Sequence, residues 1–305
     1  MARGILLWTV NAPNHSSQGL GFEKWEGLGN DFVLVAAEAA AAFWGPAGPS
    51  AEQVRQLCDR RRGIGADGVL LVAGIAAGRP TMIVRNADGS RPEMCGNGLR
   101  CVVGRVAAER ARSHGELVVG TDAGERRCSF THDAQGGPVV AIDMGAARLG
   151  PSSELEHDGR TIAFRRVELG NPHAVTFDPC SQAEIDRLGA ELDTTTAGGC
   201  NVEFCRLAAA DGALEVTVWE RGVGRTLACG TGACAAAAVA VSSGRLAAGR
   251  ALEVRLPGGA LRIDVTLPGL ELRLEGPARR VFRGELSPSF GGVAASRPPP
   301  AVVQR

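Results

Sequence analysis

The chain has 305 residues, which is long enough to bury a large core and suits two domains of ordinary size. Its 33 basic and 33 acidic residues cancel, which argues against nucleic acid or an anionic membrane as partner and favours a small neutral or zwitterionic ligand. No apolar run approaches the roughly 20 residues of a membrane-spanning helix, and the first residues do not resemble a secretion signal, so we expect a soluble, cytoplasmic protein.

Lysine and cysteine usage limits the chemistry further. Lys24 is the only lysine, which makes pyridoxal phosphate an improbable cofactor because that cofactor needs a lysine for its Schiff base. The nine cysteines are odd in number and have no framework of short spacings, so they indicate free thiols in a reducing compartment.

Residues 1–20 show no usable pattern and are expected to be a disordered extension. A glycine-rich turn then leads into an apolar strand at 32–35. Ser50 and Gln53 have the spacing of a capping box and predict a helix that ends in the basic residues 60–62 before a glycine. Strands are predicted at 69–72 and 81–85.

The next landmark is the turn Cys95-Gly96-Asn97-Gly98, which opens a run with helical periodicity over 99–107. Short strands follow at 117–119, 128–131 and 139–143. We place the change of domain at Met144-Gly145. The first unit is therefore expected to be a helix among mostly short strands.

The second half of the chain repeats these landmarks. The turn Cys229-Gly230-Thr231-Gly232 lies 134 residues after the first thiol turn, and Gly170-Asn171 lies 141 residues after Gly29-Asn30. The glycine turn at 257–259 matches the turn at 122–124 at a similar offset. We interpret this as a two-fold internal repeat that brings two thiols to one site.

The remaining elements of the second unit complete the pattern. An alternating strand is predicted at 214–219, and the helix at 233–241 is apolar on every face, which indicates that sheet encloses it. Strands at 251–256, 260–265 and 270–274 can provide that enclosure. The Pro- and Ala-rich residues 287–305 are expected to be a disordered tail.

A cysteine just before a helix faces unpaired backbone N–H groups and the positive end of the helix dipole, which lower the pKa of its thiol. The glycines of each turn would let a ligand carboxylate approach those N–H groups. Two such turns facing each other would place one sulfur on either side of an α-carbon. One thiolate could remove the α-proton while the other thiol protonates the opposite face, which inverts the centre without metal or cofactor.

Three other interpretations remain open from the residues alone. A structural zinc site is possible, although no C-x-x-C pair is present. A single nucleophilic cysteine with His173 as base explains one turn and not its copy. Cys95 and Cys229 could also be ordinary core residues. The other seven cysteines are interpreted as structural: Cys58, Cys101, Cys128, Cys180, Cys200, Cys205 and Cys234.

Six segments resemble diaminopimelate epimerases, in the same order and over about residues 22–286. They are KWEGLGNDFVLV from Lys24, RGIGADGVLLV from Arg62, NADGSRPEMCGNGLR from Asn86, GNPH from Gly170, NVEF from Asn201 and ERGVGRTLACGTGACA from Glu220. Each motif is modest alone, and together they are highly specific.

The resemblance implies interconversion of L,L- and meso-diaminopimelate without a cofactor, with Cys95 acting on the L-configured centre and Cys229 on the D-configured one. It also implies an α+β fold of two pseudo-symmetric domains, each a barrel-like, mostly antiparallel sheet around a central helix. The domains would comprise residues 21–144 with about 276–286, and residues 145–275. A homodimer is a further possibility.

The resemblance assigns the remaining site residues as well. Gly96, Asn97, Gly230 and Thr231 would offer N–H groups to the reacting carboxylate; Arg221, Asn86, Asn171 and Asn201 would bind the distal carboxylate; Glu220 would bind an ammonium group, Asn30 would lie near the reacting end, and His173 would tune or orient a thiol.

Two features leave alternatives. Gly68 stands where some family members carry a glutamine that touches substrate, and an aromatic residue usual before Thr81 is missing. The nearest rival is a proline racemase or hydroxyproline epimerase, whose first turn usually has His after Cys-Gly, where this chain has Asn97. A related-fold isomerase lacking cysteine chemistry, or a non-catalytic binding protein, would retain the architecture but not need both thiols.

Overall fold

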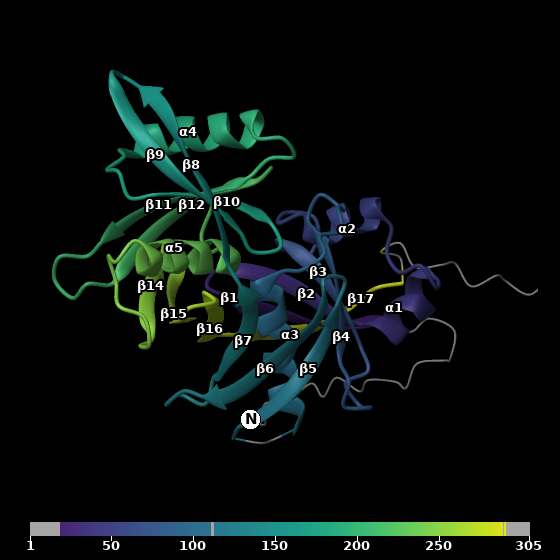
Figure 1. The fold of residues 1–305 in the computed structure, drawn as a ribbon. Helices are drawn as coiled ribbons and strands as arrows, with labels where there is room; N and C mark the ends of the chain where they lie inside the picture. Colours follow the sequence, from purple (N-terminus) through teal and green to yellow (C-terminus); the bar gives the residue numbers. More distant parts are fainter. Residues whose placement is uncertain (1–18, 111–112, 289, 291–305) are drawn as a thin grey trace, which may run out of the picture.

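The computed structural model describes residues 19–110, 113–288 and 290, and within them the chain forms seventeen strands and five helices (Figure 1). The first half contains β1 (Leu20–Gly27), β2 (Asn30–Ala36), α1 (Ala37–Trp44), α2 (Ala51–Cys58), β3 (Gly68–Ala73), β4 (Thr81–Asn86), α3 (Gly96–Arg110), β5 (Gly115–Thr121), β6 (Gly124–His132) and β7 (Pro138–Ala146).

The second half contains β8 (Arg148–His157), β9 (Arg160–Glu168), β10 (Pro172–Thr176), α4 (Gln182–Thr195), β11 (Asn201–Leu207), β12 (Leu214–Glu220), β13 (Gly224–Thr226), α5 (Gly230–Ser242), β14 (Leu252–Leu256), β15 (Gly259–Thr266), β16 (Glu271–Pro277) and β17 (Arg279–Leu286). Most strand pairs are antiparallel.

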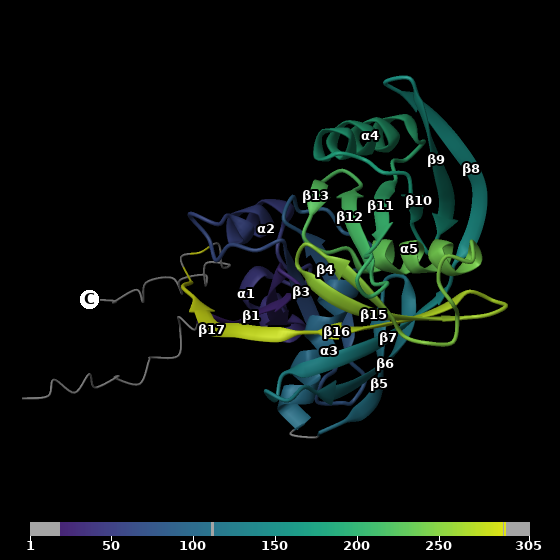
Figure 2. The ribbon, with the colours of Figure 1, turned by 90° about the vertical axis from the view of Figure 1, so that its left-hand side faces the viewer.

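Two helices, α3 and α5, each lie inside their own set of strands (Figures 1 and 2). Helix α3 packs against β1 to β4, β6, β7 and β17, and helix α5 packs against β9 to β12 and β14 to β16. We call β1 to β7 with β17 the first lobe and β8 to β16 the second lobe. This mixed α/β arrangement of mostly antiparallel sheet around two central helices agrees with the fold class predicted from the sequence.

One strand pair joins the two lobes. β7 and β16 are antiparallel, from Glu271 opposite Ala146 to Pro277 opposite Val139. The chain then enters β17, which pairs with β1 from Leu20 opposite Leu286 to Glu26 opposite Arg279. The last strand of the described chain therefore lies beside the first.

The two central helices differ in how they are buried. On α3, Leu99, Val102, Val103, Val106 and Ala107 are at most 1% exposed, as the helical periodicity predicted. On α5, the residues from Ala233 to Val241 are buried on every face, as their uniformly apolar sequence predicted. Alanine-rich α5 lets the surrounding strands approach closely.

The predicted start of α2 is confirmed and its predicted end is wrong. Ser50 and Gln53 form the capping box, but the helix ends at Cys58 and not in the basic residues 60–62. The extended backbone of Asp59 ends it, and the Asp59 carboxylate accepts hydrogen bonds from the N–H groups of Arg61 and Arg62. Arg60 is thereby free to reach Asp31 and Asp67.

The predictions for the two ends of the chain fall largely outside the described residues. Of the expected extension 1–20, only residues 19 and 20 are described, and Leu20 already belongs to β1. Of the expected tail 287–305, residues 287, 288 and 290 are described, and Phe290 packs against the cluster that contains Leu20 and Leu286.

Candidate active site

The two thiol turns have the same local structure. Cys95 directly precedes α3, and the N–H of Gly98 donates to Cys95 Sγ at 3.4 Å. Cys229 caps α5, and the N–H of Gly232 donates to Cys229 Sγ at 3.4 Å. Each sulfur therefore occupies the position of an N-cap acceptor at the amino end of a central helix.

The amino ends of α3 and α5 meet. A Cβ atom built on Gly96 would lie 4.0 Å from the Cα of Gly230, and one built on Gly230 would lie 3.9 Å from the Cα of Gly96. The side chain of Asn97 also donates to the carbonyl of Ala228 at 2.9 Å, directly before Cys229. The fold thus brings together two turns that are 134 residues apart in the sequence.

The second glycine of each turn makes room for the protein itself. A Cβ atom on Gly98 would lie 3.0 Å from Leu70 Cδ2, and one on Gly232 would lie 2.7 Å from Glu203 Oε1. These two glycines therefore allow close packing inside each lobe, and their N–H groups donate to the thiols of their own turns. The first glycines of the two turns, Gly96 and Gly230, face each other, and the expectation that a ligand carboxylate approaches the turns applies to them.

Burial changes the expected ionisation of both thiols. Burial, with a smaller contribution from the Glu220 carboxylate, raises the pKa of Cys95 to about 11 and that of Cys229 well above its ordinary value. Hydrogen bonds from Gly98 and Gly232 act in the opposite direction and are too weak to compensate. The prediction of lowered thiol pKa values is wrong, since it considered the helix ends without the loss of water around the buried sulfurs.

A chain of polar contacts leads from Cys229 into the second lobe. The Thr231 hydroxyl lies 3.5 Å from Cys229 Sγ, and Asn171 Nδ2 donates to that hydroxyl at 3.3 Å. Asn171 Oδ1 lies 3.0 Å from His173 Nε2, and His173 Nδ1 lies 2.7 Å from Glu203 Oε1. Three residues predicted from the sequence, Asn171, His173 and Thr231, are therefore linked to one thiol.

Glu203 was not predicted as a site residue. It lies in β11, both Glu203 and His173 are 0% exposed, and Glu203 Oε2 has no hydrogen-bond partner in the part of the chain that the structure describes. A carboxylate in a completely buried strand costs free energy unless it is paired. The signal in the sequence was an acidic residue inside the apolar run Val202-Glu203-Phe204.

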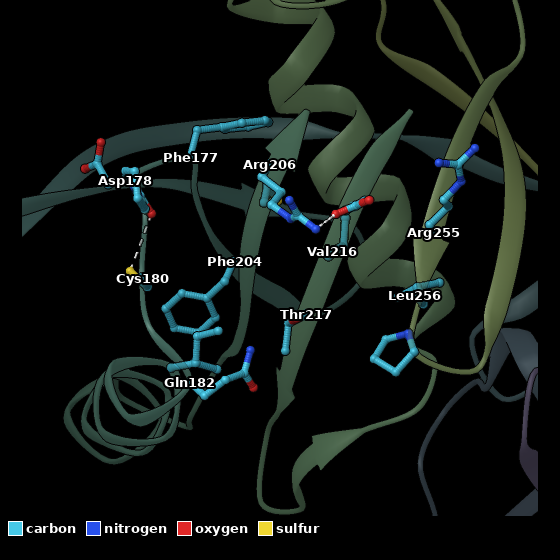
Figure 3. Close-up of a pocket in the computed structure, with 15 residues that line it drawn as sticks. Phe177, Asp178, Cys180, Gln182, Phe204, Arg206, Val216, Thr217, Arg255 and Leu256 are labelled. Atoms are coloured by element: carbon cyan, nitrogen blue, oxygen red, sulfur yellow. Dashed lines mark hydrogen bonds and ion pairs between the residues drawn. The ribbon is translucent and has the colours of Figure 1, made fainter. Parts of the chain in front are cut away.

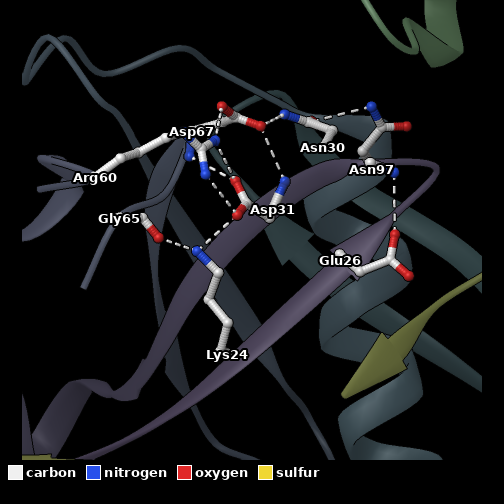
Figure 4. Close-up of polar contacts among 9 residues, drawn as sticks. Lys24, Glu26, Asn30, Asp31, Arg60, Gly65, Asp67 and Asn97 are labelled. Atoms are coloured by element: carbon white, nitrogen blue, oxygen red, sulfur yellow. Dashed lines mark hydrogen bonds and ion pairs between the residues drawn. The ribbon is translucent and has the colours of Figure 1, made fainter. Parts of the chain in front are cut away.

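On the side of Cys95, charged residues orient two asparagines (Figure 4). Asn97 Nδ2 donates to Asn30 Oδ1 at 3.0 Å, and Asn30 Nδ2 donates to Asp67 Oδ2 at 2.8 Å. Asp67 and Asp31 both accept from Arg60, and Asp31 also pairs with the buried Lys24 at 2.7 Å. Although burial opposes ionisation, the hydrogen bonds from Arg60 and Lys24 lower the pKa of Asp31 to about 2.

The remaining predicted residues form two groups. Asn201 Oδ1 accepts from the N–H of Arg221 at 3.0 Å, so these two residues lie together beside the half-buried Glu220, whose pKa is raised by burial. Asn86 is bound within its own turn and donates to Ser90 Oγ at 2.9 Å. No hydrogen bond within residues 19–110, 113–288 and 290 joins Asn86 to the other predicted site residues.

A cavity of about 520 Å³ lies in the second lobe and contains none of the predicted site residues (Figure 3). It is lined by β11, β12, β14 and the segment before α4. Its Arg206 is paired with Glu215, and its Arg255 is paired with Asp211 and Glu253. Its fourth charged residue, Asp178, accepts a hydrogen bond from the N–H of Ala163 at 2.8 Å, so each charged side chain that lines the cavity already has a partner in the protein.

The described residues also bear on metal binding and on membrane insertion. Among them, no cluster of three or more His, Cys, Asp or Glu side chains could hold a metal ion. None of the helices in that part of the chain combines the length and the apolar character needed to cross a bilayer.

Comparison with known proteins gives consistent matches. A family model described as diaminopimelate epimerase matches residues 22–150 and 166–281. The diaminopimelate epimerases of Synechocystis sp. and Desulforudis audaxviator are 38% and 39% identical to the chain, and each match covers 87% of this chain and 98% of the relative.

Solved structures share the fold at low sequence identity. A hydroxyproline epimerase from Agrobacterium vitis superposes with a TM-score of 0.66 at 14% identity, covering 90% of this chain and 95% of that one. A phenazine biosynthesis protein of the PhzF family from Bacillus anthracis superposes with a TM-score of 0.66 at 13% identity, covering 88% and 99%.

Proposed function

The chain belongs to the diaminopimelate epimerase family, and from that premise we propose that Cys95 and Cys229 are the two acid–base groups of its reaction. The enzyme is an isomerase that interconverts L,L- and meso-diaminopimelate. The observation that supports the proposal most directly is that the two equivalent thiol turns face each other. A Cβ atom built on either Gly96 or Gly230 would lie within van der Waals distance of the Cα of the other glycine.

The reacting carboxylate binds where the two helices begin. The N–H groups at Gly96, Asn97, Gly230 and Thr231 point along the helix axes, and the positive dipole ends favour an anion there. The α-carbon of that carboxylate then lies between Cys95 and Cys229. Asn30, which is hydrogen-bonded to Asn97, borders the same end of the substrate.

The distal end of diaminopimelate carries a second carboxylate and ammonium group. Arg221 offers a fork of donors for that carboxylate, with Asn171, Asn201 and Asn86 as additional amides. Glu220 is the acceptor for the distal ammonium group. The contact between Asn201 and the N–H of Arg221 supports a shared subsite for these residues.

Proton transfer requires one thiolate and one thiol. In the direction that starts from the L-configured centre, Cys95 removes the α-proton and Cys229 delivers a proton to the opposite face. The negative charge that develops on the carboxylate is stabilised by the helix ends in a site without bulk water. When the product leaves, Cys95 is the thiol and Cys229 is the thiolate.

Glu220 has a second role in the proposal. Because the Glu220 charge raises the pKa of both thiols, an ammonium group that binds Glu220 offsets that charge and favours formation of one thiolate. His173 supports Cys229 through Asn171 and Thr231.

The experiment is incubation with L,L-diaminopimelate in heavy water under reducing conditions. We expect deuterium at one α-carbon of each turned-over molecule, together with the meso isomer, by mass spectrometry and chiral chromatography. Exchange of proline alone would identify a proline racemase instead, and no exchange with either substrate would refute the proposed function.

The thiol assignment has its own test. Cys95→Ala and Cys229→Ala should each lower kcat for epimerisation by at least about a thousandfold, since each removes one of two acid–base groups. Cys180→Ala, which removes a half-buried thiol elsewhere in the second lobe, should retain normal kcat. Full epimerisation by either active-site variant would refute the two-base mechanism.

The domain boundaries, the cellular compartment and the oligomeric state complete the proposal. The two domains are residues 21–144 with about 276–286, and residues 145–275, which is supported by the separate strand sets around α3 and α5. The enzyme acts in the cytoplasm, where its thiols stay reduced. It forms a homodimer, for which the exposed apolar residues Val281 and Phe282 on β17 provide a surface.

A further inference from the structure

The two thiol turns differ at their third residue. The repeat places Asn97 in the first turn at the position of Thr231 in the second. The Thr231 hydroxyl stays beside the thiol of its own turn, 3.5 Å from Cys229 Sγ. The Asn97 amide instead reaches the other lobe and donates to the carbonyl of Ala228 at 2.9 Å. This hydrogen bond directly links the first thiol turn to the residue before the second thiol.

Two acceptors, the carbonyl of Ala228 and the side-chain oxygen of Asn30, fix the orientation of the Asn97 amide. A backbone carbonyl can only accept, so Asn97 must present its Nδ2 to Ala228. The same Nδ2 donates to Asn30 Oδ1 at 3.0 Å. If the Asn97 amide turned by half a rotation, its oxygen would face two acceptor oxygens, and both hydrogen bonds would be lost.

Asp67 determines which way the Asn30 amide points. Asp67 Oδ2 accepts from Asn30 Nδ2 at 2.8 Å and from the N–H of Asp31 at 3.0 Å, while Asp67 Oδ1 accepts from Arg60 at 2.7 Å (Figure 4). A carboxylate surrounded by three donors acts only as an acceptor. Asn30 therefore turns its amino group to Asp67 and its oxygen to Asn97.

The neighbours of Asn97 fix the orientation of its side-chain amide, and this orientation leaves the amide oxygen without a hydrogen bond among the described residues. Asn97 is 3% exposed, yet its Oδ1 has no hydrogen-bond partner in the described part of the chain. That oxygen lies 3.8 Å from the position of a Cβ atom on Gly230. An amide chosen only for local stability would not leave a buried acceptor unpaired, so the network on its other side controls it.

We propose that Asn97 is a latch that holds the two thiol turns at their working separation, and that Asp67 is the positioning residue that sets the latch through Asn30. The proposal deepens the two-thiol mechanism and rests on it for its kinetic consequence. Its geometric consequence, the separation of Cys95 from Cys229, can be measured without any substrate.

Two variants remove the latch in different ways. Asn97→Thr copies the third residue of the second turn, so it suits the turn geometry but cannot reach Ala228. Asp67→Asn keeps the shape of Asp67 and removes its charge. The guanidinium of Arg60 then takes the remaining oxygen, the new amino group faces Asn30, and Asn30 must turn a donor toward Asn97.

The geometric measurement is the equilibrium between the reduced protein and a Cys95–Cys229 disulfide in a glutathione redox buffer, read by peptide mapping. Each disulfide formed reduces one oxidised glutathione to two thiols, so the constant reports the effective concentration of one thiol at the other. We expect both variants to lower this constant and kcat at least tenfold relative to the wild type.

Asp31→Asn is the matched control. It removes a charge from the same cluster, where the Asp31 side chain binds Lys24, Arg60 and the N–H of Asp67, but no hydrogen bond among the described residues joins that side chain to Asn30. We expect it to lower the melting temperature and leave the disulfide constant within threefold of the wild type. Asn97→Thr leaves the whole charged cluster intact, so it decides the question alone if Asp67→Asn fails to fold.

The outcomes separate the two proposals. A wild-type disulfide constant in Asn97→Thr would overturn the latch, whatever the activity of the enzyme. An Asp31→Asn constant that falls as far as that of Asp67→Asn would show a general loss of packing and would overturn the role of Asp67. An inactive wild-type protein with the expected changes in the constant would overturn the proposed function and leave the latch standing.

Discussion

At the scale of single residues, burial favours the protonated form of both active-site thiols. Cys229 is only 6% exposed, and both sulfurs receive a helix N–H bond that would favour a thiolate in a more hydrated site. Burial and the Glu220 carboxylate outweigh those bonds. The raised pKa values protect both thiols from adventitious alkylation and oxidation, since the thiolate is the reactive form.

This protection gives a pH prediction. With a pKa of about 11 for Cys95, its thiolate fraction should rise about tenfold with each pH unit between pH 7 and pH 10. The alkylation rate of Cys95 by iodoacetamide, followed by peptide mass spectrometry, should rise in parallel and not level off near the pKa of an ordinary thiol.

Glu220→Gln provides the control for that measurement. Because the Glu220 charge raises the pKa of both thiols, its removal should speed alkylation of Cys95 and Cys229 at pH 8. An unchanged rate in Glu220→Gln would mean that burial alone sets the thiol pKa values.

Sequence reasoning found the residues that a local pattern marks and missed those that only the fold brings near. Cys95 and Cys229 stand in a duplicated motif, so their meeting could be predicted. Asp67 and Glu203 act through residues 37 and 30 positions away, on Asn30 and His173. No local periodicity carries that information. The ionisation of the thiols was also missed, because the degree of burial is a property of the assembled lobes.

At the scale of elements, the prediction succeeded where turns and alternation are strong. The strands beginning near 32, 69, 81 and 214 and both central helices were found. Helix α1 was missed because its alanines give no amphipathic pattern, with only Ala40 and Trp44 buried. Helix α4 was missed although Ser181 and Glu184 form a capping box as clear as that of α2.

The start of α5 provides a test at this scale. Gly232 lies against Glu203 Oε1, so Gly232→Ala would place a methyl group 2.7 Å from a buried carboxylate that is bonded to His173. We expect a loss of about 1–3 kcal/mol of stability from overpacking, measured by urea unfolding, together with a lower kcat.

Gly222→Ala is a useful comparison for Gly232→Ala. A Cβ atom there would meet nothing within 4 Å, but its φ of 70° makes any side chain strained. It should therefore lose stability while keeping kcat. Equal kcat values in the two variants would show that the contact between Glu203 and Gly232 does not affect the thiol.

At the scale of the whole molecule, the proposed homodimer would use exposed apolar residues of β17. Val281 and Phe282 are 51% and 45% exposed, and Phe282 stacks edge-on against Phe22 of β1 at 5.9 Å. Large exposed apolar residues on neighbouring positions of one strand are typical of a protein–protein interface.

Phe282→Glu should therefore shift the proposed homodimer toward monomer in sedimentation velocity, since it introduces a charge into an apolar surface. Leu267→Glu, at a residue that is 53% exposed outside β17, should leave the dimer intact. A monomeric wild-type protein would refute the dimer, and a dimeric Phe282→Glu would place the interface elsewhere.

The approach of Gly96 to Gly230 has a consequence for how the site could have arisen. The two residues meet as equivalent residues of two identical subunits would meet on the axis of a symmetric dimer, where every contact must occur twice. Such a dimer would carry two amide contacts like that of Asn97 or none. A single chain escapes this requirement, so one half can hold Asn97 and the other Thr231. The surroundings of each sulfur can then differ, so that each thiol acts on one of the two configurations of the α-carbon.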